Sequence, residues 1–521
     1  MEREIPSVRG VVLEQSPYAI IKEGFPYNEY LTQEEPFTQD EIKMAAQLAG
    51  ALNRSIHTDE WLNQLGKMIG KSFPSAFKIR ILSLSDSMEV VEKLPTQKEY
   101  DTLREKLEEL LNEFKPNVND IPRFVGKVLD DGIGYGFIGT PMRDPELEEI
   151  MVNGTQRNIF VYHRKHGMCK TDLLIEGHDQ NMGRIIDKAA NYAGRTFGEK
   201  EPLLDARLPD GSRLNATFET ITPFGRSLTI RKFTAESFSI IDLIAKGTLS
   251  TELAAFLWTM VEGMNVQPMN LIVTGGAGCG KTSLLNALSS VIRYRERIIT
   301  IEDTTELQFQ HRENWVSLES KPRIGSMRGT SMNDLLTNAM RMRPDRIIVG
   351  EVRGEEAQTL FVAMDTGHQG ILGTLHSNTA REMLVRLTTE PMNVPQSLLH
   401  LLNLIVVLQR VHDPKRGMQR RVMQVAEVSH LDKNVLLSNL FERNPDTDVV
   451  LRTDTPSHIM QELADISGKG KQHIMREIEV REKILEWMLK HHIHQSGDVE
   501  KVIQEYYFDP TAVLEQINKE L

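Results

Sequence analysis

The sequence predicts an α/β protein built on a mainly parallel sheet with helices on both faces, and three observations predict it. A short apolar strand, 270–274, runs into a glycine-rich loop that is followed at once by a helical pattern. Strand-like and helix-like segments then alternate from residue 297 to residue 376. Residues 119–232 contain shorter elements separated by turn signals such as Asp210-Gly211, which indicate a smaller α/β domain ahead of the larger one.

The chain has 521 residues, of which 40% are hydrophobic, so it can form several cores and about three domains. We expect a mixed α/β extension at the N-terminus and a mainly helical extension at the C-terminus. The expected boundaries are 1–118 for the N-terminal extension, 119–232 for the smaller α/β domain, 233–245 for a linker, 246–431 for the larger α/β domain and 432–521 for the C-terminal extension.

Periodicity defines the elements of the first two segments. The N-terminal extension is expected to contain a strand-like opening over 10–21 and helices over 42–52 and 98–114, the second of which ends at Lys115-Pro116. In the smaller domain, 158–163 and 227–233 alternate as half-buried strands do, and 181–193 has helical periodicity.

The larger domain repeats strand and helix, which predicts ligands at the carboxyl ends of its strands. Its predicted strands are 297–303, 346–351 and 370–376, and its predicted helices are 332–342 and 355–366. In the C-terminal extension we expect one long amphipathic helix, marked by Ile474, Ile478, Ile484, Leu485 and Met488.

The glycine-rich loop is a phosphate-binding P-loop in its strand-loop-helix context. Its backbone N–H groups and the helix N-terminus can surround an anion, Lys281 can reach the β- and γ-phosphates, and the Thr282 hydroxyl can bind Mg²⁺. The segment therefore predicts binding of ATP or GTP, with Cys279 as a small space-filling residue. The predicted nucleotide-binding residues are Gly275, Gly276, Ala277, Gly278, Cys279, Gly280, Lys281, Thr282 and Ser283.

Acidic residues follow two of the predicted strands. Glu302 and Asp303 end one strand, with Glu306 three residues on, and Glu351 ends another. In P-loop NTPases such acids hold Mg²⁺ and aim a water molecule at the γ-phosphate. Many of these enzymes have an aspartate where this chain has Gly350, so we expect Glu302 or water to compensate.

Two histidines stand on either side of the predicted strand 370–376. His376, at its carboxyl end, is placed to sense or polarise the γ-phosphate, and His368 is placed to hold the end of the preceding helix. A purely structural role for both histidines stays open.

Four arginines of the smaller domain form a further group: Arg207, Arg213, Arg226 and Arg231. An arginine can stabilise the charge that builds on phosphate oxygens during phosphoryl transfer. The alternative is that these are ordinary surface arginines.

Composition limits the class of protein. The net charge of −12 argues against nucleic-acid binding as the main function, although a local basic groove stays possible. The only two cysteines, Cys169 and Cys279, exclude a disulfide framework and a four-cysteine zinc site. The longest apolar stretch, 401–408, is too short to cross a bilayer and no signal segment follows Met1, so we expect a cytoplasmic protein.

Taken together, four ordered motifs resemble those of the type II/IV secretion ATPase superfamily, and Gly350 matches this family's own version of the second acidic motif. The motifs are 275–282 (Walker A), 301–306 (Asp box), 341–354 (Walker B) and 367–378 (His box). Segments 207–215, 227–233 and 390–395 are most similar to the archaeal branch, which includes the ATPases of archaeal type IV pili and of the archaellum.

The resemblance implies a RecA-like P-loop ATPase domain preceded by a smaller PAS-like domain, with ATP bound between the two. It also implies a homohexamer attached peripherally to the cytoplasmic face of the membrane. There, ATP hydrolysis would power the assembly or secretion of type IV pilus-like filaments through a polytopic platform protein. Neither nucleic acid nor zinc is expected.

The same resemblance implies roles for individual residues. Glu351 would activate water, Glu302 and Thr282 would organise Mg²⁺, and His376 would read the γ-phosphate. Arg213, Arg226 and Arg231 would couple the γ-phosphate to the other domain.

Two alternatives stay open. The RecA-like scaffold also serves DNA-transfer and nucleic-acid-translocating ATPases, which the acidic charge and the lack of aromatic-rich basic repeats disfavour. The other alternative is a nucleotide-regulated scaffold that binds ATP without hydrolysing it.

Overall fold

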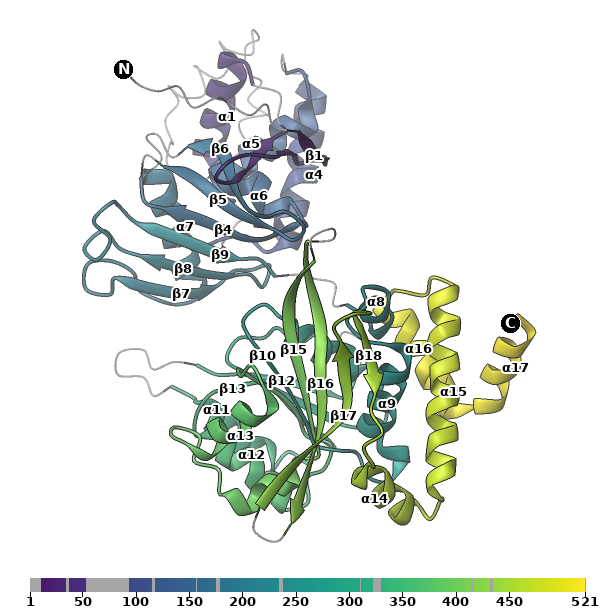
Figure 1. The fold of residues 1–521 in the computed structure, drawn as a ribbon. Helices are drawn as coiled ribbons and strands as arrows, with labels where there is room; N and C mark the ends of the chain where they lie inside the picture. The colour runs from purple at the N-terminus through teal and green to yellow at the C-terminus, as the bar shows by residue number, and fades with distance from the viewer. Residues whose placement is uncertain are drawn as a thin grey trace, which may run out of the picture. The chain divides into compact units, whose positions relative to one another are not determined.

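The structure is a computed structural model that describes residues 11–33, 37–52, 93–114, 118–155, 157–174, 179–233, 238–309, 311–321, 329–413, 417–431 and 434–520. The chain divides into two compact units, Met1–Thr234 and Ala235–Leu521 (Figure 1). The division falls inside the predicted linker 233–245, and helix α8 (Ile240–Ala245) forms the end of that segment. The other boundaries predicted from the sequence stay predictions.

Unit 1 is built on one nine-stranded sheet with the order β1-β2-β3-β6-β5-β4-β9-β8-β7. β3 and β6 are parallel, and the other neighbouring strands are antiparallel. The strands are β1 (Val12–Gln15), β2 (Ala19–Lys22), β3 (Asn28–Thr32), β4 (Leu147–Asn153), β5 (Asn158–His163), β6 (Gly167–Leu174), β7 (Leu203–Arg207), β8 (Arg213–Thr217) and β9 (Ser227–Arg231).

Helix α7 (Asp179–Tyr192) shares an apolar core with this sheet. Ile186 of α7 belongs to the same buried cluster as Val161 of β5 and Ile230 of β9. Burial alternates along β5, as the period of two in its sequence predicts. The two strands and the helix predicted for this region are therefore confirmed. Two short elements, η2 (Gly136–Ile138) and α6 (Gly139–Arg143), precede β4.

A separate core in unit 1 joins α1 (Gln39–Leu52), α4 (Gln97–Phe114) and α5 (Ile121–Gly132). It confirms both helices predicted for the N-terminal extension.

The strand-like opening differs from the prediction, because it forms two antiparallel strands, β1 and β2, instead of one. Pro17 interrupts it, since proline has no backbone N–H to donate. The Ser16 hydroxyl accepts a hydrogen bond from the Ala19 backbone N–H at 3.1 Å and closes the turn. Gly10, where the predicted strand begins, lies outside the described residues.

Unit 2 contains a second nine-stranded sheet with the order β12-β11-β13-β14-β10-β15-β16-β17-β18. Neighbouring strands from β12 to β15 are parallel, and those from β15 to β18 are antiparallel. The strands are β10 (Leu271–Gly275), β11 (Ile298–Glu302), β12 (Trp315–Glu319), β13 (Arg346–Val352), β14 (Leu372–Leu375), β15 (Leu404–Asp413), β16 (Gly417–Leu431), β17 (Asn434–Asn444) and β18 (Val449–Arg452).

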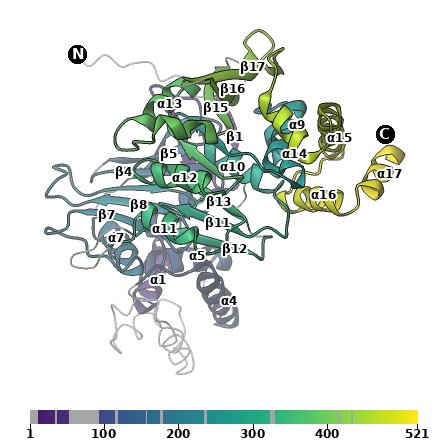
Figure 2. The same cartoon turned by 90° about the horizontal axis from the view of Figure 1, so that it is seen from below.

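Helices cover both faces of this sheet, as the alternating pattern predicts. Leu271 and Val273 of β10 belong to one core, and Ile272 between them belongs to the other. The first core includes residues of α8, α9 (Thr251–Glu262), α10 (Lys281–Ser289), α14 (His458–Ser467), α15 (Lys471–Lys490), α16 (Ser496–Phe508) and α17 (Pro510–Glu520), and the second includes α11 (Met332–Ala339), α12 (Glu356–Asp365), α13 (Ala380–Thr388) and η4 (Gln396–Leu401). Figure 2 shows α11, α12 and α13 apart from α9, α14 and α15, with the strands between them.

The C-terminal segment is helical only from α14 onward. β17 and β18 precede that helix and extend the sheet, although the sequence predicts helical structure from about residue 432. The predicted amphipathic helix is confirmed as α15, and Ile474, Ile484 and Met488 on it are fully buried. In the described part of the chain we find no helix with both the length and the hydropathy that a bilayer span requires.

Candidate nucleotide site

The P-loop joins β10 to α10, and its shape requires glycine at three positions. A Cβ atom at Gly275 would lie 2.3 Å from the carbonyl oxygen of Leu408 and 2.5 Å from the sulfur of Cys279. Gly278 and Gly280 have φ angles of 67° and 97°, a region that other residues rarely adopt. The backbone can therefore curl as phosphate binding needs, and Gly280 leads directly into α10.

Two residues of the loop have clear roles in this geometry. The Lys281 ammonium donates hydrogen bonds to the carbonyl oxygens of Gly275 and Gly276 at 3.0 and 3.1 Å, so it lies over the curl of the loop. Cys279 is 1% exposed, and burial raises the pKa of its thiol. Cys279 therefore fills space beneath the loop, as the sequence predicts.

The acidic loop after β11 lies against the start of α10. The Thr282 hydroxyl donates to a carboxylate oxygen of Glu306 at 3.3 Å. Oε1 of Glu302 accepts hydrogen bonds from the backbone N–H groups of Glu306 and Leu307 at 2.9 and 3.0 Å, and these fix the loop that carries Glu306. Glu302 is only 2% exposed. Burial raises the pKa of Glu302 to about 7, although the two amide hydrogen bonds act to lower it.

Gly350 on β13 makes room for Glu302. A Cβ atom at position 350 would lie 2.8 Å from Cγ and 3.1 Å from Oε1 of Glu302. The Thr374 hydroxyl holds the Gly350 carbonyl oxygen from the other side, at 2.6 Å. A larger residue such as aspartate would therefore collide with Glu302 at position 350 of this fold.

Glu351 is a charged carboxylate at the same edge of the sheet. Its Oε2 lies 2.5 Å from Nη2 of Arg353, and the Glu351 side chain is 28% exposed. Burial acts to raise the pKa of Glu351, but the hydrogen bond and charge of Arg353, with the charges of Lys281 and His376, outweigh it and lower this pKa. Glu351 is therefore ionised and able to accept a proton.

The two predicted histidines differ in their surroundings. His376 directly follows β14, and its carbonyl oxygen accepts a hydrogen bond from Nη1 of Arg386 at 2.5 Å. Nδ1 of His368 lies 3.3 Å from the carbonyl oxygen of Ala363 in α12, which agrees with a role in holding the helix end.

The strand order explains why these groups converge. β11, β13, β14 and β10 are successive parallel neighbours, so their carboxyl ends meet at one edge of the sheet. Glu302 is the last residue of β11, Glu351 is the last but one of β13, His376 follows β14, and the P-loop begins at the end of β10. The structure thus brings together the predicted site residues of unit 2, including oxygen donors of the kind that Mg²⁺ prefers, Thr282 and Glu306.

The predicted arginines all lie in unit 1, and three of them form a row across its sheet. Arg213 on β8 is the direct cross-strand neighbour of Arg207 on β7 and of Arg231 on β9. Arg226 lies apart from the row, in an ion pair with Glu219 at 2.5 Å. Acids also lie beside the row: Arg213 is 3.5 Å from a carboxylate oxygen of Asp205, and the other cross-strand neighbour of Arg231 is Glu149.

A family model described as "Type II/IV secretion system protein" matches residues 137–491, which is more than half of the chain. The chain therefore belongs to the type II/IV secretion family. This confirms the family predicted from the four motifs, together with the fold class and the class of enzyme, an ATPase.

This type II/IV secretion protein spans very different shares of its individual relatives. The uncharacterized protein MJ0781 of Methanocaldococcus jannaschii is 46% identical over 280 residues, which cover 53% of this chain and 38% of that protein. The conjugal transfer protein TrbB of Rhizobium radiobacter is 31% identical over 324 residues, covering 60% of this chain and 93% of TrbB. The crystal structure of the VirB11 ATPase from the Brucella suis type IV secretion system has a TM-score of 0.29 and 23% identity, covering 55% of this chain and 90% of VirB11.

Sequence reasoning missed one residue that touches the P-loop of this secretion-family protein. Nε of Arg420 on β16 donates to the carbonyl oxygen of Gly278 at 3.0 Å. Its cross-strand neighbour Arg410 on β15 also approaches Gly278, because a Cβ atom there would lie 3.5 Å from Nη1 of Arg410. Only the pairing of β10 with β15 reveals this contact, since the two segments are far apart in sequence.

Proposed function

We propose that this type II/IV secretion family protein hydrolyses ATP to drive the assembly or secretion of type IV pilus-like filaments. The observation that supports this most is the convergence of Lys281, the Thr282–Glu306 pair and the ionised Glu351 at the carboxyl ends of adjacent parallel strands. Such an arrangement offers a phosphate cradle, oxygen donors and a proton acceptor within one site.

Each of these groups has a role in the proposed reaction. The P-loop amides and Lys281 would bind the β- and γ-phosphates, and Glu351 would orient a water molecule and accept its proton. The ion pair with Arg353 would keep Glu351 ionised until it accepts that proton. His376 would read the γ-phosphate from the end of β14.

Magnesium would be held by Thr282 together with the acidic loop. Bound there, Mg²⁺ would neutralise charge on the β- and γ-phosphate oxygens. Glu306 joins Glu302 in this role, because its carboxylate already accepts a hydrogen bond from Thr282. Glu302 would contribute chiefly by holding the backbone of Glu306 in place.

The arginines of unit 1 would bind phosphate oxygens. Arg207, Arg213 and Arg231 stand in one row across the sheet, and phosphate oxygens would compete with Asp205 for Arg213. Arg226 would act separately from the row.

The larger machine is a further part of the proposal, and it rests on the family resemblance. We expect a homohexamer on the cytoplasmic face of the membrane that works through a polytopic platform protein. The filament would be a pilus, an archaellum or a secretion pseudopilus.

Phosphate release under MgATP tests the proposed reaction. We expect Glu351→Gln to slow release by about 10²–10⁴-fold while binding of a fluorescent ATP analogue is retained, because only the proton acceptor is lost. Glu355→Gln, at an exposed glutamate immediately before α12, is the matched control and should hydrolyse ATP at the unmodified rate. If the unmodified protein and Glu351→Gln show the same negligible activity, with or without lipid, the chain binds nucleotide without turnover and the proposal fails.

DNA transfer is a second candidate, because the relative TrbB is named a conjugal transfer protein. The net charge of −12 disfavours a nucleic-acid substrate. Adding single-stranded or double-stranded DNA at low salt separates the two functions. A clear, salt-sensitive increase in ATP hydrolysis would favour DNA transfer.

A further inference from the structure

The rear end of the P-loop helix depends on side chains that are distant in sequence. Helix α10 ends at Ser289, and the carbonyl groups of the turn that directly follows it, residues 290–292, take hydrogen-bond partners from a distant part of the chain. Nε2 of Gln504 donates to the carbonyl oxygens of Ile292 and Ser290 at 2.8 and 3.3 Å. The Tyr507 hydroxyl donates to the carbonyl oxygen of Val291 at 2.6 Å. Both side chains belong to α16.

A third donor, Arg312, is itself held by α16. Nη2 of Arg312 donates to the carbonyl oxygens of Ser289, at 3.0 Å, and Ile292. Its Nε lies 2.6 Å from a carboxylate oxygen of Glu500 on α16, and the two side chains are 3% and 8% exposed. A buried cation at a helix C-terminus also complements the helix dipole.

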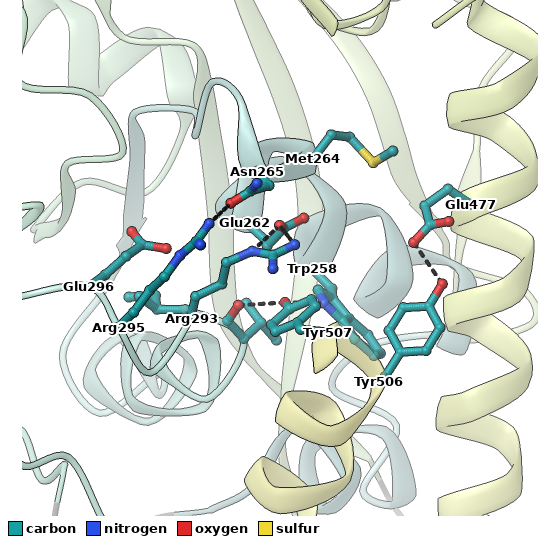
Figure 3. Close-up of polar contacts among 12 residues, drawn as sticks. Trp258, Glu262, Met264, Asn265, Arg293, Arg295, Glu296, Glu477, Tyr506 and Tyr507 are labelled. Carbon is teal, nitrogen blue, oxygen red and sulfur yellow. Dashed lines mark hydrogen bonds and ion pairs between the residues drawn. The ribbon is translucent and has the colours of Figure 1, made fainter. Parts of the chain in front are cut away.

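Helix α16 is anchored firmly enough to hold α10. Figure 3 shows Tyr507 beside Trp258 of α9, whose indole N–H donates to the tyrosine hydroxyl at 2.5 Å. Tyr506 points the other way and donates to Glu477 of α15 at 2.8 Å. The completely buried Glu262 of α9 also pairs with Arg481 of α15 at 2.9 Å. The anchoring residues therefore come from α9 and α15.

Helix α16, which makes these contacts, lies beyond the part of the chain that the family model matches. That match ends at residue 491, whereas α16 spans Ser496–Phe508. The front end of α10 carries Lys281 and Thr282. This helix has only nine residues, so its two ends are about 14 Å apart and a displacement at the rear reaches the front.

We propose that Gln504 and Tyr507 are positioning residues for nucleotide binding, which act by holding the rear of α10 in place. The inference rests on the proposed nucleotide function of the P-loop. Misplacement of a reacting group by about 1 Å can cost about 10²-fold in rate, so small movements of Lys281 matter. Helix α16 is then part of the ATP site, although it touches no phosphate-binding residue.

Two neighbouring tyrosines give a matched pair of variants in the full-length protein. Tyr507→Phe removes a hydroxyl bound to Val291 in the turn after α10, and Tyr506→Phe removes a hydroxyl bound to Glu477. Both tyrosines lie on α16, and Tyr507→Phe also loses the hydrogen bond that the Trp258 indole N–H donates to the tyrosine hydroxyl. If both tyrosines had a purely structural role, both variants would be less thermally stable and would bind nucleotide with the same affinity.

The measurements are equilibrium binding of a fluorescent ATP analogue and the separate values of kcat and KM. We expect Tyr507→Phe to weaken binding and to lower kcat/KM by about 10-fold or more, within the range of rate loss that misplacement allows. Tyr506→Phe should stay within about twofold of the unmodified protein. Equal affinities for the two variants would overturn the inference.

A second variant keeps the test decisive if Tyr507→Phe does not fold. Gln504→Glu retains the acceptor for the Tyr294 backbone N–H, at 3.0 Å, but removes the donor to Ser290 and Ile292. Glu505→Gln, at an exposed position of the same helix, is its control. Weaker binding in Gln504→Glu alone supports the inference, and unchanged binding overturns it. If the unmodified protein binds no nucleotide at all, the proposed function fails first.

Discussion

Replacing Gly350 by alanine tests the steric relation between the two acidic motifs. The added Cβ would lie 2.8 Å from Cγ of Glu302, and the three nearest atoms all belong to that side chain. Glu302 cannot swing aside freely, because the backbone N–H groups of Glu306 and Leu307 hold its Oε1. Overpacking of this kind costs about 1–3 kcal/mol, which corresponds to a fall in Tm of about 2–12 °C at about 2–4 °C per kcal/mol.

The assay is a double-mutant cycle on the unfolding free energy. Because the collision is with one side chain, Gly350→Ala should cost less than about 0.5 kcal/mol when Glu302 is already alanine. Phosphate release should fall in Gly350→Ala, since displacement of Glu302 also moves Glu306. If Gly350→Ala costs as much in the Glu302→Ala background as in the unmodified protein, the clash with Glu302 is not what requires glycine.

The buried groups and the arginine row give four more predictions. Neither thiol should react with an alkylating reagent at pH 8 until the protein is unfolded, because Cys169 and Cys279 are at most 1% exposed and burial raises the pKa of both. Arg481→Met should lower the unfolding free energy by about 3–5 kcal/mol in urea titrations, since it removes one partner of a buried ion pair, and a change below about 1 kcal/mol would contradict this. Burial acts to raise the pKa of Glu262, but the charge of Arg481 contributes to a net lowering from 4.5, so the folded protein binds fewer protons than the unfolded chain. The stability that Glu262 contributes is therefore present above about pH 4.5 and lost as the pH falls through its lower folded value, and Glu262→Gln should show a flatter acid limb in a Tm–pH profile. Arg213→Gln removes the like-charge contacts with Arg207 and Arg231 and also an ion pair with the exposed Asp205, so at low salt the stability of unit 1 should change by less than about 1 kcal/mol while ATP turnover falls, and a larger loss of stability would argue for a structural arginine.

The sequence predicts those parts of the site that depend on a local pattern. The P-loop, the acids at the ends of β11 and β13 and the histidine after β14 all follow an apolar strand, and parallel pairing brings them together. The sequence does not predict β17 and β18. The apolar positions of a short segment fit a strand as well as a helix, and only the pairing of β17 with β16 and of β18 with β17 shows that these segments are strands. The division of roles between Glu302 and Glu306 also depends on burial, which Gly350 on another strand determines.

The contacts that escape prediction share a physical cause. At Gly275 the space beside Leu408 leaves room for no side chain, so only one residue type fits and the sequence reveals it. At the rear of α10, any side chain with a hydrogen-bond donor could satisfy the free carbonyl groups, and here Gln504 and Tyr507 do so. No residue type or spacing is required there, so no motif forms. A functional residue can therefore be predicted from the sequence where only one residue type can do its task. Residues that hold such a site in place can be of several types, so they are found only in the folded structure.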